Sequence, residues 1–185
     1  MTRLKRETRE TTVTLAIQRQ GGEISVQTDD TLLTHRLETL ARYAGLGLTL
    51  KATGDLKHHL IEDVAITLGL ALKKEAPDTA ARYGWAVIPM DEALVEAAVD
   101  VGGRPYYVGP LPSRLYEHFL QSLSVNLGAT VHIRVLRGKD RHHMVEAAIK
   151  AFGVALRQAL TEGGAVFSTK GSVSLEWGEG DRANP

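Results

Sequence analysis

The protein has 185 residues with 22 basic and 22 acidic side chains, and it contains no cysteine. This length, with 43% hydrophobic residues, allows a core that folds without disulfides. Because the charges balance and aromatic residues are sparse, neither nucleic acid nor an anionic membrane is an expected partner. No signal peptide or membrane span is expected, which predicts a cytoplasmic protein. Without thiolates, strong metal ligands must come from His, Asp and Glu.

The first half, about residues 1–80, is predicted as ββαβα from the spacing of its apolar residues. Gly21-Gly22 separates two alternating segments, which predicts a β-hairpin. The last helix of this half is expected to end before Pro77. The patterns predict strands over 13–19, 23–28 and 46–52, and helices over 32–43 and 60–74.

The second half, about 81–177, repeats this order, and residues 178–185 are expected to be a disordered tail. Strands are predicted over 83–88, 93–101, 106–108 and 130–136, and helices over 115–127 and 142–160. A duplication is indicated because seven identities keep a constant offset. Gly54, His58, His59, Glu62, Gly69, Ala71 and Leu72 recur as Gly138, His142, His143, Glu146, Gly153, Ala155 and Leu156.

Two His-His-x-x-Glu segments, His58–Glu62 and His142–Glu146, begin the last helix of each half. The spacing predicts that the second histidine shares a helical face with the glutamate, while the first projects about 100° away around the axis. Each segment therefore offers ligands in two directions and could serve two metal sites. Two copies in register favour this reading over two solvated helix starts. Imidazole and carboxylate ligands admit Zn, Fe, Ni, Co or Mn, so the spacing alone leaves the metal open.

Three further histidines and one lysine are candidates on weaker grounds. His132 alternates with apolar neighbours on a predicted strand, where a core histidine is the commoner alternative. His35 and His118 lie early on corresponding helices, and an exposed polar face explains either. Lys150 follows Glu146 by one turn and could position an anion or assist proton transfer, although an ordinary surface lysine fits the spacing equally well.

Along almost its whole length the chain resembles the imidazoleglycerol-phosphate dehydratase family. Each matching segment alone is weak evidence for this family, but the number of matches and their order along the chain are specific to it. The matching segments are Arg6-x-Thr8-x-Glu10-Thr11, His58-His59-x-x-Glu62-Asp63, Arg82-Tyr83-Gly84, Pro89-Met90-Asp91-Glu92-Ala93-Leu94, Val99-Asp100-x-Gly102-Gly103-Arg104-Pro105, Thr130-Val131-His132-Ile133, His142-His143-x-x-Glu146, Lys150-Ala151 and Ser168-Thr169-Lys170-Gly171.

The resemblance implies an α/β (α+β) fold of duplicated halves, like domain 2 of ribosomal protein S5, in a 24-subunit shell with metal sites between subunits. It implies dehydration of imidazole glycerol phosphate to imidazole acetol phosphate in histidine biosynthesis, with two Mn²⁺ per active site binding the ring as an imidazolate. The implied metal ligands are His35, His58, His59, Glu62, His132, His142, His143 and Glu146. His118 has no such counterpart and is interpreted as structural or exposed.

The resemblance also assigns the substrate contacts. A phosphate pocket is implied from Arg82, Arg104, Ser168 and Lys170, whose guanidinium, hydroxyl and ammonium groups suit a phosphate monoester. Proton transfer is implied for Glu10, and Asp91 and Lys150 are candidates for holding hydroxyl groups and relaying protons.

The first half departs from the family pattern. Thr34-His35-Arg36 stands where the family usually has Asp-His-Met, Thr39 replaces a substrate-contacting Gln, and Tyr43-Ala44 replaces a His-Gly pair. In the second half, Asp140 stands where Asn is usual. Two alternatives therefore stay open: a catalytically impaired relative that keeps the metal-assembled shell, and a dinuclear metal phosphoesterase.

Overall fold

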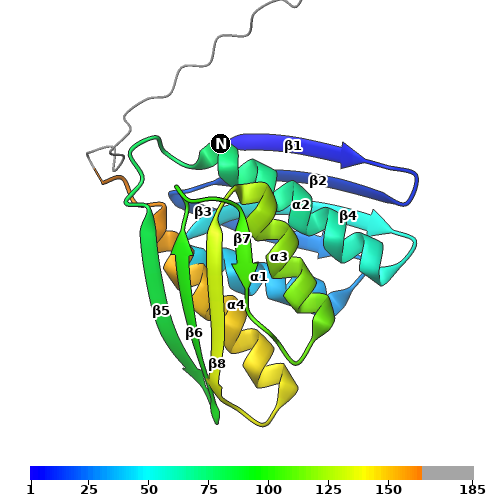
Figure 1. Ribbon diagram of the computed structural model, residues 1–185. Coiled ribbons are helices and arrows are strands. Elements are labelled where there is room, and N and C mark those ends of the chain that lie inside the picture. Colours follow the sequence, from blue (N-terminus) through cyan, green and yellow to red (C-terminus); the bar gives the residue numbers. More distant parts are fainter. Residues whose placement is uncertain (164–185) are drawn as a thin grey trace, which may run out of the picture.

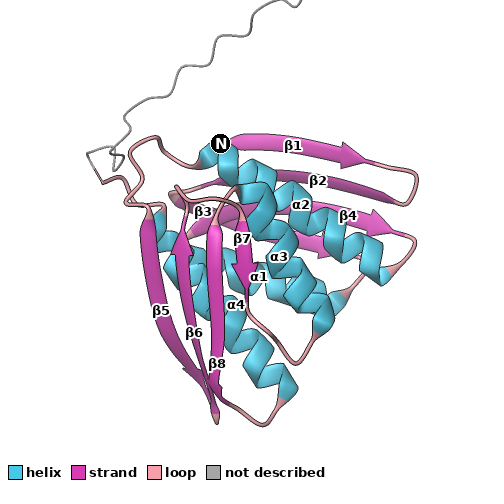
Figure 2. Ribbon diagram, in the orientation of Figure 1, coloured by secondary structure: helices cyan, strands magenta, loops and turns pink. Residues whose placement is uncertain are grey.

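The computed structural model describes residues 1–163. Four helices lie between two four-stranded sheets, with two helices supplied by each half of the chain (Figures 1 and 2). The first half contains β1 (Thr2–Glu7), β2 (Thr11–Gln18), β3 (Gly21–Thr28), α1 (Thr31–Ala44), β4 (Leu46–Gly54) and α2 (Lys57–Glu75). The second contains β5 (Tyr83–Met90), β6 (Ala93–Asp100), β7 (Tyr106–Val108), α3 (Arg114–Leu127), β8 (Thr130–Arg137) and α4 (Arg141–Ala159).

The two sheets have the same topology, β1-β2-β4-β3 and β5-β6-β8-β7, which confirms the predicted duplication. Each half is βββαβα, so the predicted ββαβα order of the first half lacked one strand. The missing strand is β1. Its exposed residues Arg3 and Lys5 are charged and few of the residues between them are apolar, as is typical of an edge strand.

The predicted hairpin at Gly21-Gly22 is wrong. β4 lies between β2 and β3, pairing antiparallel with β2 and parallel with β3. Both glycines have positive φ, 70° and 131°, so the chain does turn there. Alternation within two neighbouring segments identifies strands, but it carries no information about which strand will lie between them.

The core forms between the inward faces of the sheets and the helices. Alternate residues of the central strands are buried, as the alternating sequence pattern predicts. A fully buried valine, leucine or isoleucine contributes about 1.5–3 kcal/mol to stability, and a buried alanine contributes less. These residues are Val13, Leu15 and Ile17 in β2 and Val95, Ala97 and Val99 in β6.

Helix pairs from opposite halves pack closely at two of the repeated glycines. α1 packs against α4 and α2 against α3. A Cβ added to Gly153 would lie 2.9 Å from the Cβ of Tyr43, and one added to Gly69 would lie 2.6 Å from the carbonyl oxygen of Leu123. Each glycine therefore allows the close crossing that brings a histidine-bearing helix of one half against the other half.

Within residues 1–163, none of the four helices combines the length and the apolar character needed to cross a lipid bilayer.

Candidate metal centre

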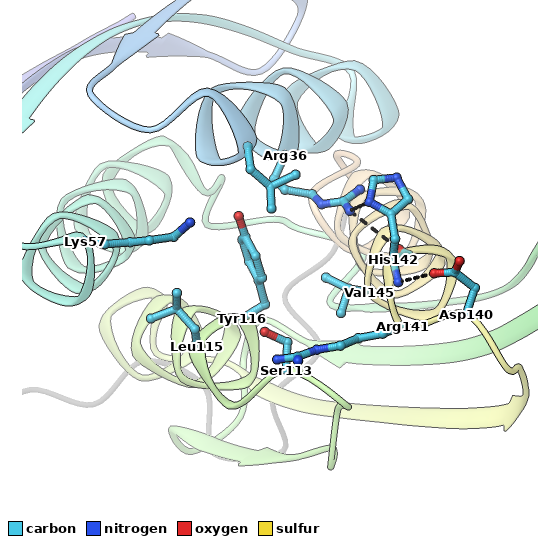
Figure 3. Close-up of a pocket in the computed structure, with 10 residues that line it drawn as sticks. Arg36, Lys57, Ser113, Leu115, Tyr116, Asp140, Arg141, His142 and Val145 are labelled. Carbon is cyan, nitrogen blue, oxygen red and sulfur yellow. Dashed lines mark hydrogen bonds between the residues drawn. The ribbon is translucent and has the colours of Figure 1, made fainter.

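The first turns of all four helices meet around one pocket of about 460 Å³. Its walls contain two pairs of residues that occupy corresponding positions in the two halves, Leu32 with Leu115 and Lys57 with Arg141. Figure 3 shows these helix starts converging on the pocket from different sides. Two groups of histidine and glutamate side chains lie near these helix starts, one for each pair of packed helices, and His142 of the second group lines the pocket.

The first group, the Glu62 cluster, consists of His58, Glu62 and His118. His58 Nε2 lies 3.6 Å from Glu62 Oε2, and His118 Nε2 lies 3.3 Å from Glu62 Oε1. The two imidazole rings stack with centroids 5.3 Å apart. One nitrogen or oxygen from each residue lies within 4.8 Å of the others, so the three fit a single divalent cation with mixed imidazole and carboxylate ligands.

The second group, the Glu146 cluster, consists of His35, His142 and Glu146. His35 Nε2 and His142 Nε2 each lie 3.3 Å from Glu146 Oε2. His35 is the fifth residue of α1 and His118 the fifth residue of α3, so the two clusters are equivalents in the duplicated fold. The donor types are the same, two imidazoles and one carboxylate, but among residues 1–163 only the Glu62 cluster brings its three ligand atoms within 4.8 Å of one another.

His118 therefore lies in a cluster with two of the expected ligands, His58 and Glu62. A signal was present in the chain: aligning α1 with α3 puts His118 opposite His35. This alignment is shifted by one residue from that of the His-His-x-x-Glu segments, because Ala129, which follows the αL cap at Gly128, makes the connection from α3 to β8 one residue longer than its counterpart after Gly45.

The prediction of which histidine accompanies each glutamate is also wrong. The first histidine of each pair, His58 or His142, is the one nearest the glutamate, in an i,i+4 arrangement. Helical side chains lean towards the helix N-terminus, which lets residues four apart meet. The expectation of ligands in two directions holds, since His59 and His143 have other partners.

His59 and His143 are each held by carboxylates from a neighbouring loop. His59 Nδ1 lies 2.9 Å from Asp55 Oδ1 and 3.5 Å from Glu10 Oε2. The hydrogen bond with Asp55 raises the pKa of His59. Glu10 lies in the β1–β2 turn, immediately before Thr11 of β2, whose hydroxyl donates to the buried carboxylate of Asp63 on α2.

His143 has the equivalent arrangement in the second half. Its Nδ1 lies 2.8 Å from Glu92 Oε2, and its Nε2 lies 3.4 Å from Asp91 Oδ2. The hydrogen bond with Glu92 raises the pKa of His143. Backbone amides of Asp140 and Lys139 donate to Glu92 and, with His143, lower its pKa to about 2. Two of the predicted proton-transfer residues, Glu10 and Asp91, thus lie beside the outward histidines.

Arg36 and Lys150 neutralise the Glu146 cluster from within the protein. Arg36 is 2% exposed; its Nη1 donates to Glu146 Oε2, and its Nη2 donates to His142 Nδ1 at 3.0 Å. Figure 3 shows this guanidinium reaching His142 beside the pocket. Lys150 Nζ lies 2.9 Å from Glu146 Oε1 and 5.6 Å from the centroid of the Tyr43 ring. Burial alone raises the pKa of Glu146, but the hydrogen bonds from Lys150 and Arg36 outweigh it and lower the pKa to about 2.

The comparisons with known proteins agree on one family. The sequence profile described as imidazoleglycerol-phosphate dehydratase matches residues 28–156. A protein of that name from Pyrobaculum aerophilum is 50% identical over 182 residues, which cover 90% of this chain and 96% of the relative. The chain belongs to the imidazoleglycerol-phosphate dehydratase family. This membership makes it a lyase of histidine biosynthesis and confirms the resemblance stated from sequence.

Solved dehydratase structures have the same fold. The crystal structure of imidazoleglycerol-phosphate dehydratase from Pyrococcus furiosus superposes with a TM-score of 0.83 at 41% identity, covering 92% of this chain and 100% of that one. The enzyme from Staphylococcus aureus superposes with a TM-score of 0.77 at 31% identity, covering 86% and 98%. The predicted α/β fold of duplicated halves is thereby confirmed.

Not all of the ligands that the dehydratase resemblance implied are brought together. His132 lies exposed on the outer face of β8 beside Tyr106, with ring centroids 5.9 Å apart. Its neighbours Val131 and Ile133 point inward to the helices, so the alternation of the strand turns His132 away from both clusters. Within one subunit, His118 stands where His132 was expected.

The implied phosphate residues lie far from the histidine clusters of the same dehydratase subunit. Arg82 precedes β5 and pairs with Asp100 at 2.8 Å, and Arg104 lies in the exposed loop before β7. His143 contacts Asp91, just beyond the other end of β5. Ser168 and Lys170, like the tail 178–185, lie outside the described residues.

Proposed function

We propose that this protein dehydrates D-erythro-imidazole glycerol phosphate to imidazole acetol phosphate and water, in the cytoplasm, with two Mn²⁺ per active site. The supporting observation is the pair of equivalent clusters, each with two imidazoles and one carboxylate beside an outward histidine. A single substrate ring with two nitrogens suits two such sites. Bound Mn²⁺ would supply Lewis acidity and a template for the imidazole ring.

The chain's own residues would divide the remaining work between them. Glu10 and Asp91, beside His59 and His143, are exposed carboxylates that can accept or return a proton near a bound substrate. Lys150 donates to Glu146, so its first role is to hold this carboxylate in place. The guanidinium groups of Arg82 and Arg104 would fix the phosphate and with it the carbon chain.

The separation of these groups supports sites shared between subunits. Arg82 and Asp91 stand at opposite ends of β5, whose eight residues extend over about 25 Å. A molecule made of one imidazole ring, three carbons and a phosphate cannot span that length. One substrate would therefore take its metal ligands and its phosphate contacts from different copies of the chain. This supports self-assembly, for which the family resemblance implies a 24-mer.

The second sheet offers a surface for such assembly. Trp85, Ala98, His132 and Val108 form one row across its outer face, because they are register partners on four adjacent strands. Trp85 is 69% exposed, and Tyr83 and Tyr106 beside this row are also largely exposed. Aromatic groups of this kind on one face are typical of protein interfaces.

Trp85→Ser is expected to reduce the mass of the assembled particle, because the substitution removes a large apolar contact without touching the helix starts. Multi-angle light scattering after size exclusion, with Mn²⁺ present, measures the mass. Lys51→Ser, on an exposed position of β4 in the first sheet, is the control and should leave the mass unchanged. A full-sized particle from Trp85→Ser would contradict the proposed interface.

The proposed activity is tested by assaying metal-stripped protein before and after Mn²⁺ is restored. We expect imidazole acetol phosphate to form only after restoration, and His143→Ala to fail under the same conditions. Assembly without turnover would identify a catalytically impaired relative. Release of inorganic phosphate would identify a phosphoesterase and overturn the proposal.

A further inference from the structure

We propose that Asp100 is a positioning residue for the phosphate end of the substrate, because its carboxylate holds the guanidinium of Arg82 in one orientation. The inference rests on the proposed function in taking Arg82 as a phosphate contact. Asp100 carries a negative charge and does not itself bind the phosphate. It acts through Arg82, by removing the disorder that this long side chain would otherwise lose when an anion binds.

Asp100 and Arg82 form a two-point ion pair at one end of the second sheet. Arg82 Nε donates to Asp100 Oδ1 at 2.8 Å, and Arg82 Nη2 donates to Asp100 Oδ2 at 3.1 Å. A pair of parallel hydrogen bonds fixes the direction of a guanidinium as well as its position. The carboxylate is anchored in turn, since the backbone amide of Gly102 donates to Oδ1 at 2.9 Å. Because a guanidinium is planar, its opposite edge faces away from Asp100.

The backbone of Arg82 is fixed as firmly as its side chain. Arg82 has a φ of 75°, a left-handed conformation that is uncommon for residues other than glycine. Its amide donates to the carbonyl oxygen of Ala159 at 3.0 Å, and its carbonyl accepts from the amide of Val101 at 3.0 Å. A Cβ added to Gly102 would lie 2.9 Å from Arg82 Nε, so this glycine lets the loop pack on the arginine. Backbone outliers held by their surroundings are typical of functional sites.

A carboxylate beside an anion site also repels the anion, so two opposing effects must be weighed. The side chains of Arg82 and Asp100 are 29% and 20% exposed, and water and salt screen the repulsion between Asp100 and a phosphate at such a surface. An arginine without a partner loses much rotamer freedom on binding, and Asp100 has already removed that freedom. Ordering therefore outweighs repulsion, and loss of the Asp100 charge should weaken phosphate binding.

The same strand and face supply a matched control. Glu96 lies two rows of register partners away from Asp100 on β6, and it also pairs with an arginine, Arg134, at 3.3 Å. Glu96→Gln therefore breaks an ion pair on the outer face of the second sheet without touching Arg82. It neutralises a carboxylate in the same way as Asp100→Asn does.

The test compares steady-state dehydration by the Mn²⁺-loaded protein with that by Asp100→Asn. We expect KM to rise by about tenfold and kcat to change by less than about threefold, because a contact far from the reacting atoms binds substrate and transition state alike. Inhibition by inorganic phosphate should weaken by about tenfold, whereas inhibition by imidazole should be unchanged. Weaker inhibition by both would indicate a structural defect and overturn the inference. Glu96→Gln should match the unaltered protein throughout.

A double-mutant cycle determines whether Asp100 acts through Arg82. In an Arg82→Met background, Asp100→Asn should change KM by less than about twofold, since its partner is already gone. Two separate effects that multiply would contradict a positioning role. Gly102→Ala is the second variant if Asp100→Asn does not fold, because it keeps the carboxylate and displaces the guanidinium. It should also raise KM.

Equilibrium dialysis with radiolabelled inorganic phosphate tests the inference independently of turnover. Weaker binding by both Asp100→Asn and Arg82→Met supports it, and this pattern without any turnover would overturn the proposed function alone. Unchanged or tighter binding by Asp100→Asn, with weaker binding by Arg82→Met, would overturn the inference and leave the phosphate contact in place. If neither variant changed phosphate binding, Arg82 would not be a phosphate contact, and both proposals would fail at this site.

Discussion

His118→Ala is expected to lower kcat by at least about a thousandfold, whereas His132→Ala should change kcat by less than about twofold. His118 supplies one of three ligand groups in the Glu62 cluster, so its loss leaves a single imidazole and a carboxylate from this subunit. A cation held by fewer ligands is bound weakly and supplies less stabilisation to the transition state. His132 lies exposed on the outer face of the second sheet, away from the Glu62 cluster of its own subunit.

The measurement is steady-state dehydration with Mn²⁺ in excess, accompanied by bound manganese per subunit. His118→Ala should contain less manganese than the unaltered protein, and His132→Ala the same amount. Because His132 lies in the row with Trp85, the particle mass of both variants must be checked. Full activity in His118→Ala together with loss in His132→Ala would show that the ligand set implied by the family resemblance is right and that the cluster is not a metal site.

Much of the fold followed from the spacing of apolar residues. The helices and most strands were predicted within a few residues, because a periodicity of two or 3.6 is a local property. The order of strands is not local. β1 was missed because it is a polar edge strand, and β3 was paired with the wrong neighbour because a parallel partner, β4, arrives only after a complete helix.

In the candidate site, too, the local features were predicted from the sequence and the contacts between helices were not. The His-His-x-x-Glu segments were identified from spacing, and each lies in a cluster at the start of its helix. His118 comes from another helix, so only the packing of α2 against α3 brings it to Glu62. Arg36 was noted as a departure from the family pattern, but its contact with Glu146 depends on the crossing of α1 and α4. Contacts between helices are set by tertiary structure, which the periodicity of one segment does not contain.

Gly84→Ala is expected to destabilise the fold by about 3 kcal/mol or more, because β5 lies directly on α4 at this point. A Cβ added to Gly84 would overlap the carbonyl oxygen of Ala155 and lie 2.9 Å from the backbone nitrogen of Ala159. Both obstacles are helix backbone, so neither can rotate aside as a side chain would. The strand must move away from the helix, and α4 carries His142, His143 and Glu146 at its other end.

Guanidinium titration of the metal-free protein, followed by circular dichroism, gives the free energy of unfolding. Gly21→Ala is the control because a Cβ there meets nothing within 4 Å. Gly21 has a φ of 70°, so alanine costs only about 1 kcal/mol from the left-handed backbone. If the two variants lost equal stability, β5 and α4 would have room to separate, and the contact of Gly84 with α4 would not fix the position of the second metal-binding helix. A much larger loss in Gly84→Ala than in Gly21→Ala would show that the backbone contact between β5 and α4 cannot be relieved without cost.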